Sequence, residues 1–214
     1  MDITEEVKFP TKDSEWMMKV LIGGIIGIIP IVNLISYGYS IKVMKGAIGG
    51  NPGLPKWEDW GDLFVKGLMA FIIELIYMII PILVIGISVG GALMALFTGN
   101  FETFMAALAG AIGGVLIGLI LALIALLLTP MAISMYVKED SIGAAFKIGE
   151  VMSRIKSVIG DYIMVYIILI VLGVILGILS IIPILNILII VFGSFYIMLI
   201  AYNMFGKVYA KSKA

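Results

Sequence analysis

Residues 54–64 read Leu54-Pro55-Lys56-Trp57-Glu58-Asp59-Trp60-Gly61-Asp62-Leu63-Phe64, a polar and aromatic island between two long apolar blocks. Trp57 and Trp60 are three residues apart, which predicts that their rings share one side of a helical turn. At a membrane–water interface an indole keeps its ring among acyl chains and its N–H among headgroups. Residues 54–62 are therefore predicted to be an interfacial Trp segment from which a long membrane helix rises.

The composition around this segment is that of a membrane protein. Of the 214 residues, 62% are apolar and only 13% are charged, and the mean hydropathy is +1.20. A soluble domain carries roughly 25% charged residues, so this chain has too much aliphatic surface to hide from water. The composition predicts an all-α polytopic membrane protein with membrane lipids as its surroundings.

Several classes of function are made improbable by what the sequence lacks. The net charge is zero, which argues against a nucleic-acid partner. The chain has no Cys and no His, so thiolate nucleophiles, the usual neutral-pH general base and the commonest metal ligands are missing. We therefore expect no enzyme, no cofactor and no metal site.

The first apolar block, residues 17–44, is interrupted by Pro30. Only about 13 apolar residues precede this proline, fewer than the roughly 20 that a spanning helix needs. The block is therefore either a short hairpin, possibly re-entrant, or one helix kinked at Pro30. The hairpin gives three helical hairpins in all, and the kinked helix gives five transmembrane helices with the N-terminus outside and the C-terminus inside.

The rest of the chain divides at polar segments into one transmembrane domain, residues 17–207. Residues 1–16 are expected to be a cytoplasmic or interfacial tail that ends at Trp16, a further interfacial anchor, and residues 208–214 a basic tail. The amphipathic pattern of residues 139–158 predicts a helix lying on the membrane. The predicted transmembrane helices are 63–97, 102–137, 159–182 and 184–206.

Charge placement predicts the orientation of these helices. Eleven of the fourteen Lys and Arg residues lie in or beside the segments 45–62 and 138–158 and the C-terminus, whereas the turns at 98–101 and near Pro183 have none. Basic residues favour the cytoplasmic side. We expect a multi-pass protein of the cell membrane with a cytoplasmic C-terminus, and a cytoplasmic N-terminus if residues 17–44 form a hairpin.

Residues 54–67, from Leu54-Pro55-Lys56-Trp57 to Lys66-Gly67, resemble the signature of DUF4013, a family of archaeal and bacterial membrane proteins of unknown function. The Ile-Ile-Pro-Ile-Val-Asn phrase at residues 28–33 and the following Tyr37-Gly38-Tyr39 fit the same family. The layout of hairpins and interfacial segments is also similar, more loosely, to the six-helix YciC-like inner-membrane proteins. The resemblance implies no activity, substrate or catalytic residue.

The most informative polar residue within the apolar blocks is Glu74. An ionisable group inside a membrane helix is costly and suggests a transport site. The structural alternative is a protonated or hydrogen-bonded carboxyl, or one within reach of the interface, with Tyr77 one turn along as a neighbour. Asn33, Asn186 and Asn203 either cap turns and join helices or line a polar cavity with Glu74.

One helix carries a small residue at every fourth position: Ala106, Gly110, Gly114, Gly118 and Ala122. Small residues let helix backbones approach closely. The stripe is predicted to pack within the chain, and its alternative use is a face for a homo-oligomer or a membrane partner protein. Taken together, the features favour a protein that organises the membrane, interacts with lipid or holds a partner. A small oligomeric transporter or channel using Glu74 is the second hypothesis.

Overall fold

The computed structural model describes residues 2–183 and 185–213, and every regular element in these residues is helical. The chain forms two compact units. Unit 1 holds the residues up to Phe71 and from Met131 onward, and unit 2 holds Ile72–Pro130. Each unit is described separately.

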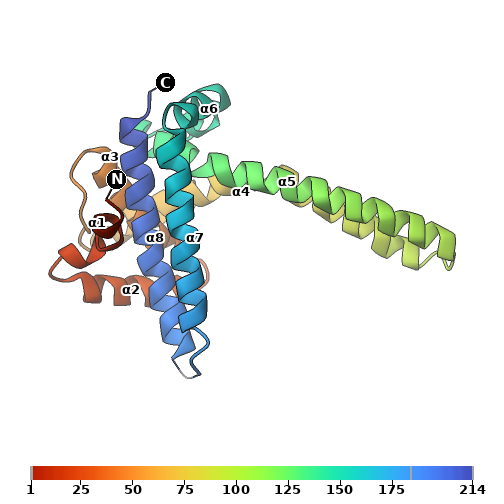
Figure 1. The fold of residues 1–214 in the computed structure, drawn as a ribbon, viewed down its shortest axis with the longest axis horizontal. Helices are drawn as coiled ribbons and strands as arrows, with labels where there is room; N and C mark the ends of the chain where they lie inside the picture. Colours follow the sequence, from red (N-terminus) through yellow and green to blue (C-terminus); the bar gives the residue numbers. More distant parts are fainter. Residues whose placement is uncertain (1, 184, 214) are drawn as a thin grey trace. The chain divides into compact units, whose positions relative to one another are not determined.

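The longest feature of unit 1 is a hairpin of α7 (Ile159–Leu179) and α8 (Asn186–Lys211). At one end Lys211 Nζ lies 2.8 Å from Asp161 Oδ2. Toward the other end the Leu176 side chain packs on Gly193. The two helices therefore run side by side in opposite directions, as Figure 1 shows.

A shorter pair of helices, α2 (Trp16–Ile28) and α3 (Asn33–Ile48), packs on this hairpin. The chain turns between them where Ile29 is extended before Pro30, the conformation that a following proline favours. Ile31 has φ 72°, an unusual value for a β-branched residue. The Ser36 hydroxyl donates to the Gly23 carbonyl over 2.8 Å and joins the two helices.

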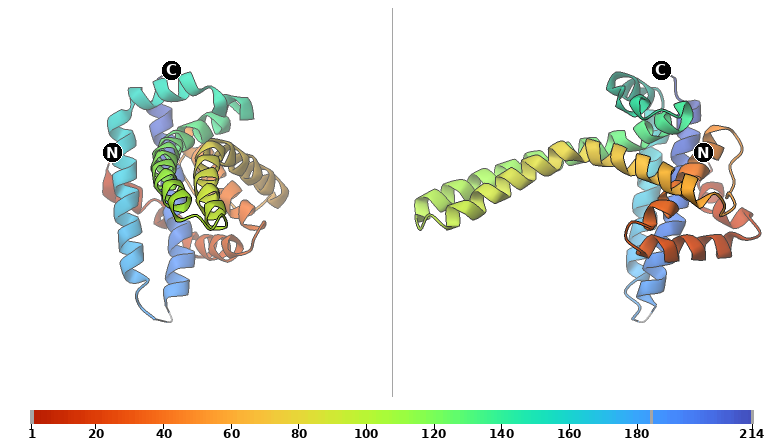
Figure 2. Two further views of the ribbon diagram at one scale, coloured as in Figure 1. Left: turned by 90° about the vertical axis from the view of Figure 1, so that its right-hand side faces the viewer. Right: turned by 180° about the vertical axis from the view of Figure 1, so that it is seen from behind.

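Helix α2 lies crosswise to α7 and α8 in Figures 1 and 2. It meets α8 through Gly23, where a Cβ would overlap the Phe195 ring, and through Gly24 against Phe192. Helix α3 packs on α8 through Tyr37 and Tyr202, whose ring centroids are 5.7 Å apart. The lack of side chains on the two glycines thus allows a short helix to pack closely across a long one.

The segment expected to be a cytoplasmic or interfacial tail is folded over residues 2–15, and it packs on α8 and α2. They form α1 (Ile3–Val7) and the 3-10 helix η1 (Pro10–Lys12). Asp2 caps α1 by accepting a hydrogen bond of 2.9 Å from the Thr4 N–H. Phe9 is buried in the hydrophobic core of unit 1. This core explains why so polar a segment is ordered.

Two long helices connect the units: α4 (Trp60–Leu96) and α5 (Phe101–Glu139), with Pro81 and Pro130 inside them. Within unit 2, residues 72–96 of α4 and 101–130 of α5 run side by side (Figures 1 and 2), and we call them the two arms of unit 2. The turn between them uses Gly99 at φ 68°, a conformation that glycine adopts readily. Asn100 Oδ1 then caps α5 by accepting from the Thr103 N–H over 2.9 Å.

Residues 139–158 hold the 3-10 helix η2 (Ile142–Phe146) and the short helix α6 (Ile148–Ser157) in place of one continuous helix. Val151 and Ile155 of α6 are buried, whereas Ile148 and Met152 are exposed.

Four of the described helices are long and apolar enough to cross a membrane: α4, α5, α7 and α8. Together with the all-helical fold they confirm the predicted class, an all-α multi-pass membrane protein. Helix α2 is apolar but shorter than a span, with 13 residues. Helix α8 continues to Lys211, five residues beyond the predicted end at 206.

Candidate functional site

The most deeply placed charged group of unit 1 is the Glu6 carboxylate, which is 6% exposed. Lys207 Nζ lies 2.8 Å from both of its oxygens, and Asn203 Nδ2 donates to Oε2 over 2.9 Å. A buried carboxylate requires such partners because its desolvation is otherwise costly. We call Glu6, Asn203 and Lys207 the Glu6 clamp.

The Glu6 clamp contains one unsatisfied atom. Asn203 is fully buried, and its Oδ1 has no hydrogen-bond partner among the described residues. Its amide is oriented by the Nδ2 bond to the Glu6 carboxylate, since the oxygen would repel that group. Asn203 therefore joins the N-terminal segment, residues 2–15, to α8.

A second attachment lies further along α8. The Tyr196 hydroxyl donates to the Val7 carbonyl over 2.9 Å, and the Trp16 ring packs edge-on against the Tyr196 ring with centroids 6.0 Å apart. Trp16 is half-buried, so it contacts protein as well as the surroundings. The N-terminal segment is thus held at two places on one helix.

Lys19 forms a polar junction at the start of α2. Its buried ammonium lies 2.6 Å from Asp13 Oδ2 and 3.2 Å from the Leu54 carbonyl. Burial alone raises the pKa of Asp13, but the hydrogen bonds from Lys19 and the Glu15 N–H, with the Lys19 charge, hold that pKa below its usual value. The ion pair therefore connects the N-terminal segment, α2 and the stretch before α4.

Trp57 completes this junction. Its Nε1 donates to the Lys19 carbonyl over 3.1 Å, and its ring stacks on the Tyr39 ring at 4.0 Å between centroids. The Tyr39 hydroxyl donates to the Pro55 carbonyl over 2.7 Å. The N–H of Trp57 is thus bonded within the protein.

The predicted helical turn through both tryptophans is wrong. Residues 54–59 are not helical, and α4 begins at Trp60. Trp60 is 45% exposed, and its ring lies 5.9 Å from that of Trp57. The Leu54-Pro55 start explains the difference, because proline has no N–H and disfavours helix in the residue before it. Trp60 keeps the exposure that an interfacial anchor needs.

The base of α4 packs on α3 through two glycines. A Cβ on Gly38 would overlap the Leu63 carbonyl oxygen, and one on Gly67 would overlap the Leu34 carbonyl oxygen. Close contact of this kind requires residues without side chains. The Leu-Pro-x-Trp stretch is therefore fixed from both sides, by the junction at Lys19 and by this helix crossing.

Within unit 1, the structure does not gather the predicted asparagines into one cavity. Asn33 and Asn186 are the first residues of α3 and α8, and Asn186 Oδ1 accepts from the Ile187 N–H over 2.7 Å. Asn203 is about 25 Å along α8 from Asn186 and belongs to the Glu6 clamp. Glu74 is exposed on α4 within unit 2, and Tyr77 is half-buried one turn along.

Only part of the small-residue stripe of α5 packs against α4. Gly114 packs against Ser88 and Gly118 against Ile85, both on α4. Ala106 is exposed, and a Cβ on Gly110 would meet nothing within 4 Å, while Ala122 is half-buried. The stripe has period four and drifts around the helix, so only its middle faces the partner arm.

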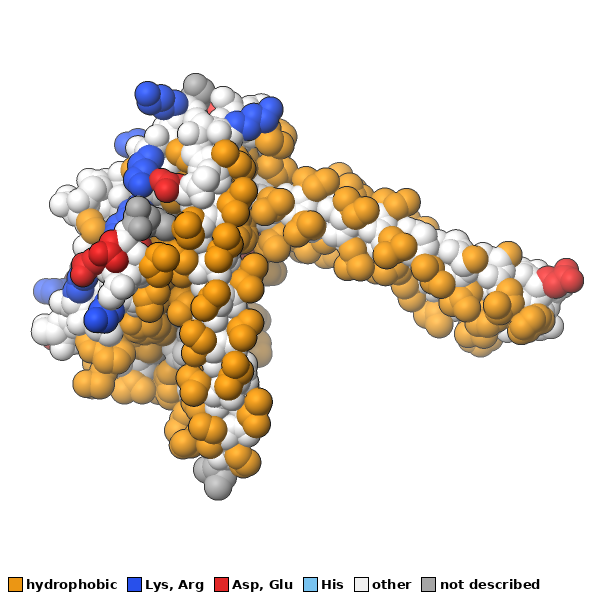
Figure 3. Space-filling model, in the orientation of Figure 1, with side chains coloured by type: hydrophobic (Ala, Val, Ile, Leu, Met, Phe, Trp, Pro, Cys, Tyr) orange, Lys and Arg blue, Asp and Glu red, His pale blue; other side chains and the backbone are white. Residues whose placement is uncertain are grey.

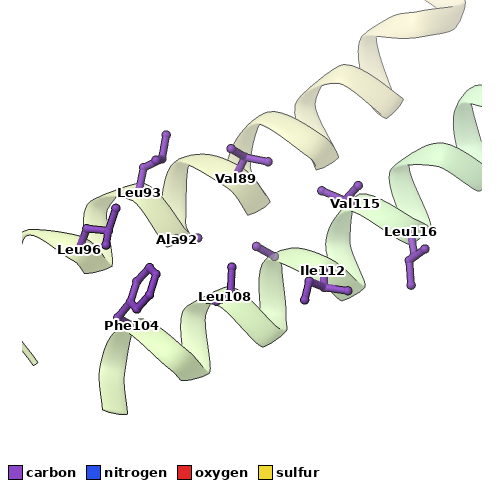
Figure 4. Close-up of a pocket in the computed structure, with 10 residues that line it drawn as sticks. Val89, Ala92, Leu93, Leu96, Phe104, Leu108, Ile112, Val115 and Leu116 are labelled. Carbon is purple, nitrogen blue, oxygen red and sulfur yellow. The ribbon is translucent and has the colours of Figure 1, made fainter. Parts of the chain in front are cut away.

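Beside this contact is an apolar pocket of about 440 Å³ near the turn of unit 2. Figure 4 shows its lining side chains on the two arms. They are all aliphatic or aromatic, and include Val89, Leu93, Phe104, Leu108 and Ile112. With no polar group to orient a reacting molecule, this pocket suits a lipid chain or another apolar surface.

The charged end of unit 1 is where α6 and the end of α8 meet. Arg154 Nη2 lies 2.8 Å from Glu150 Oε1, and its guanidinium lies over the Tyr209 ring, 4.9 Å from the centroid. Lys147 pairs with Glu139 at 2.9 Å. A cavity of about 410 Å³ beside them is lined by Lys138, Arg154 and Ser212 among others. Helix C-termini favour such cations, so these ion pairs stabilise the charged end of unit 1.

The sequence-based reasoning missed Glu6, Lys19, Asp13 and Lys207 as interacting groups. One signal was present: Asn203 and Lys207 are four residues apart on an apolar helix, so they share a face. No local pattern indicated that their partner was Glu6, which is about 200 residues away. In the part of the chain described, no group of three or more acidic residues could hold a metal ion.

Comparison with known proteins gives one match. The family described as "Protein of unknown function (DUF4013)" matches residues 21–185. The looser similarity to YciC-like proteins is not confirmed. No curated protein and no solved structure matches the chain.

Proposed function

Since the chain belongs to the DUF4013 family and is a membrane protein with several apolar helices, we propose that it is a non-enzymatic protein that organises lipid in one leaflet. The observation that carries this proposal is α2. With 13 residues it is about 20 Å long, too short for a hydrocarbon core of roughly 30 Å. It is nevertheless apolar and packs crosswise on a hairpin that is long enough to span.

The surface of α2 supports the same proposal. Its exposed side chains are apolar and include Met18, Leu21, Ile25 and Ile28. Its polar end is held inside the protein by the Lys19 junction and by Trp16 against Tyr196. An apolar helix held parallel to the membrane plane inserts into one leaflet and takes the place of lipid there.

The charged residues are mostly used in pairs that hold the fold together. Glu6 is held by Lys207, Asp13 by Lys19 and Glu150 by Arg154. The first two pairs join separate segments of the chain, whereas Glu150 and Arg154 pair within α6, beside the cavity at the charged end of unit 1. This arrangement suits a scaffold better than a transport pathway or an active site.

Glu74 is compatible with this function without a transport role. From Glu74 to the end of α4 at Leu96 is about 33 Å of helix, close to the thickness of the hydrocarbon core. Glu74 then lies where the arm of unit 2 leaves the membrane, and a carboxylate there reaches headgroups and water.

The experiment is reconstitution in vesicles of palmitoyl-oleoyl phosphatidylcholine, with shape read by electron cryomicroscopy. Wild-type protein should bend or tubulate vesicles in proportion to its density. The double variant Met18→Ser/Ile25→Ser should do so less, because both changed side chains are exposed on α2. The matched control Ile163→Ser/Ile170→Ser alters exposed positions of α7 and should retain the effect. Unchanged vesicle shape with wild-type protein would count against the proposal.

A further inference from the structure

Charged residues of the N-terminal segment lie beside the α7–α8 hairpin, far from the charged end of unit 1 at Lys211. Trp16 packs on Tyr196, which is about 22 Å along α8 from Lys211 at the charged end. Asp13 and Lys19, both close to Trp16 in sequence, form their ion pair in this region. Helix α7, at 21 residues, is itself only about 31 Å long. Polar groups therefore extend beyond the middle of a hairpin that matches the hydrocarbon core in length.

The opposite side of the hairpin is apolar at the same distance. Leu176 packs on Gly193, so Val174 on α7 is close to the level of Tyr196 on α8. Val174 and Ile170 are exposed and apolar. Figure 3 shows the same contrast within unit 1: charged side chains cover the face that carries α1 down to α2, whereas the α7–α8 hairpin is hydrophobic beyond them.

A flat bilayer cannot match both the charged side of unit 1, which carries the N-terminal segment, and its apolar side at α7. If the hydrocarbon begins near Lys211 on every side, Lys8 and Glu15 lie within it, although both are exposed and charged side chains in hydrocarbon are costly. If it begins near Tyr196 on every side, Val174 and the rest of α7 toward Ile159 stand in water. For a hairpin that stands close to the membrane normal, only a boundary that changes height around unit 1 avoids both costs.

We infer that the leaflet on the charged side is thinned beside α2, so that water and lipid headgroups reach the level of Tyr196 there and not beside α7. This inference rests on the proposed function and specifies where the lipid is disturbed. Helix α2 forms the floor of the thinned region: the polar N-terminal segment is on one side of it and the exposed Met18, Leu21 and Ile25 face lipid chains on the other.

The segment offers headgroups specific contacts. Lys8 is exposed and forms no ion pair with any described residue, so it is available to a lipid phosphate. Glu15 is 72% exposed at its side chain and only 4.0 Å from Lys19 Nζ, so it stays in contact with water. Lipid phosphodiesters and their hydration water are therefore the partners of this surface.

Single cysteines test the inference, since the natural chain has none. Ser14→Cys, Val174→Cys and Ile25→Cys are made one at a time, with Lys213→Cys as the fully hydrated reference at the charged end; all four positions are exposed. The variants are reconstituted in palmitoyl-oleoyl phosphatidylcholine vesicles, and those with the charged end outward are treated with a membrane-impermeant maleimide. Each variant is first checked for wild-type elution as a folded protein.

The Ser14→Cys variant should react within about threefold of Lys213→Cys. Val174→Cys and Ile25→Cys should react at least about a hundredfold more slowly, because the reactive thiolate does not form in hydrocarbon. A slow reaction at Ser14→Cys would overturn the inference by placing the segment in lipid. Fast reaction at Val174→Cys would overturn it by placing the boundary at one height all around, and fast reaction at Ile25→Cys would overturn it by placing α2 in water. Either result leaves the vesicle-shape experiment to decide the proposed function separately.

Discussion

Asn203 of α8 donates a hydrogen bond of 2.9 Å to Glu6, a residue 197 positions earlier in the chain. Lys207, one turn further along α8, binds the same carboxylate. The first and the last helix of the protein are thus joined by one buried charge. If the proposed function is correct, this joint keeps the N-terminal segment and α2 in position.

Replacing Lys207 by Met should release the N-terminal segment. The change leaves a carboxylate that is 6% exposed without its cation, at a cost of about 1–3 kcal/mol. Trypsin cleavage after Lys8 and Lys12 in detergent should become faster. The control Lys211→Met removes a more exposed pair with Asp161, worth less than about 1 kcal/mol. Equal cleavage of both variants would show that the Glu6 clamp does not hold the segment.

Acid should weaken the junction at Lys19. The pKa of Asp13 is held below its ordinary value of 3.8, so its ionised form is favoured in the folded protein. Its contribution to stability is complete above the unfolded pKa and is lost as pH falls through the lower folded value. Thermal unfolding followed by tryptophan fluorescence should therefore show an Asp13-dependent loss below about pH 4. Asp13→Asn should abolish that part of the loss and lower stability at pH 7.

Gly38→Ala should destabilise the crossing of α3 and α4. The added Cβ would overlap the backbone oxygen of Leu63, and overpacking of this kind costs about 1–3 kcal/mol. Gly61→Ala is the control, because a Cβ there meets nothing within 4 Å and alanine is the better helix former. Unfolding temperatures in detergent compare the two. A loss in Gly61→Ala as large as in Gly38→Ala would contradict the packing explanation.

Glu74→Gln tests the transport alternative. For a residue at the membrane boundary, neutralisation should leave folding intact and leave ion permeability at the protein-free level, as in wild type. Proton flux into vesicles loaded with a pH-sensitive dye, under an imposed gradient, measures this. Flux through the wild-type protein that disappears in Glu74→Gln would instead support a carboxylate-dependent transporter.

Much of the fold follows from local sequence. The apolar blocks around Pro81 and after Asn100 are long enough to predict α4 and α5 within a few residues, because hydrophobic length is a local property. Helix α8 continues past its predicted end because Lys207 and Lys211 find carboxylates in the fold. A hydropathy pattern counts those lysines as a boundary and carries no information about their partners.

The polar sites were harder to predict for the same reason. Trp57 was expected among headgroups, yet it stacks on Tyr39 and bonds to Lys19, which are 18 and 38 residues away in the chain. Interfacial composition and a buried tertiary contact produce the same local pattern. Gly23 and Gly38 likewise show their role only when the opposing Phe195 and Leu63 are known.

Helix α2 entering one leaflet while α7 and α8 cross both is the central claim, and cysteine labelling in intact cells tests it most directly. Ile31 in the α2–α3 turn and Ile181 in the α7–α8 turn are both exposed, and Lys213 marks the charged end. By the positive-inside rule, an impermeant maleimide added outside should label Ile181→Cys, and should label Lys213→Cys only after the membrane is opened. Ile31→Cys should remain unlabelled in both conditions, because its turn ends within the bilayer. Labelling of Ile31→Cys from outside, together with Ile181→Cys, would show that α2 and α3 cross the membrane and would contradict the claim.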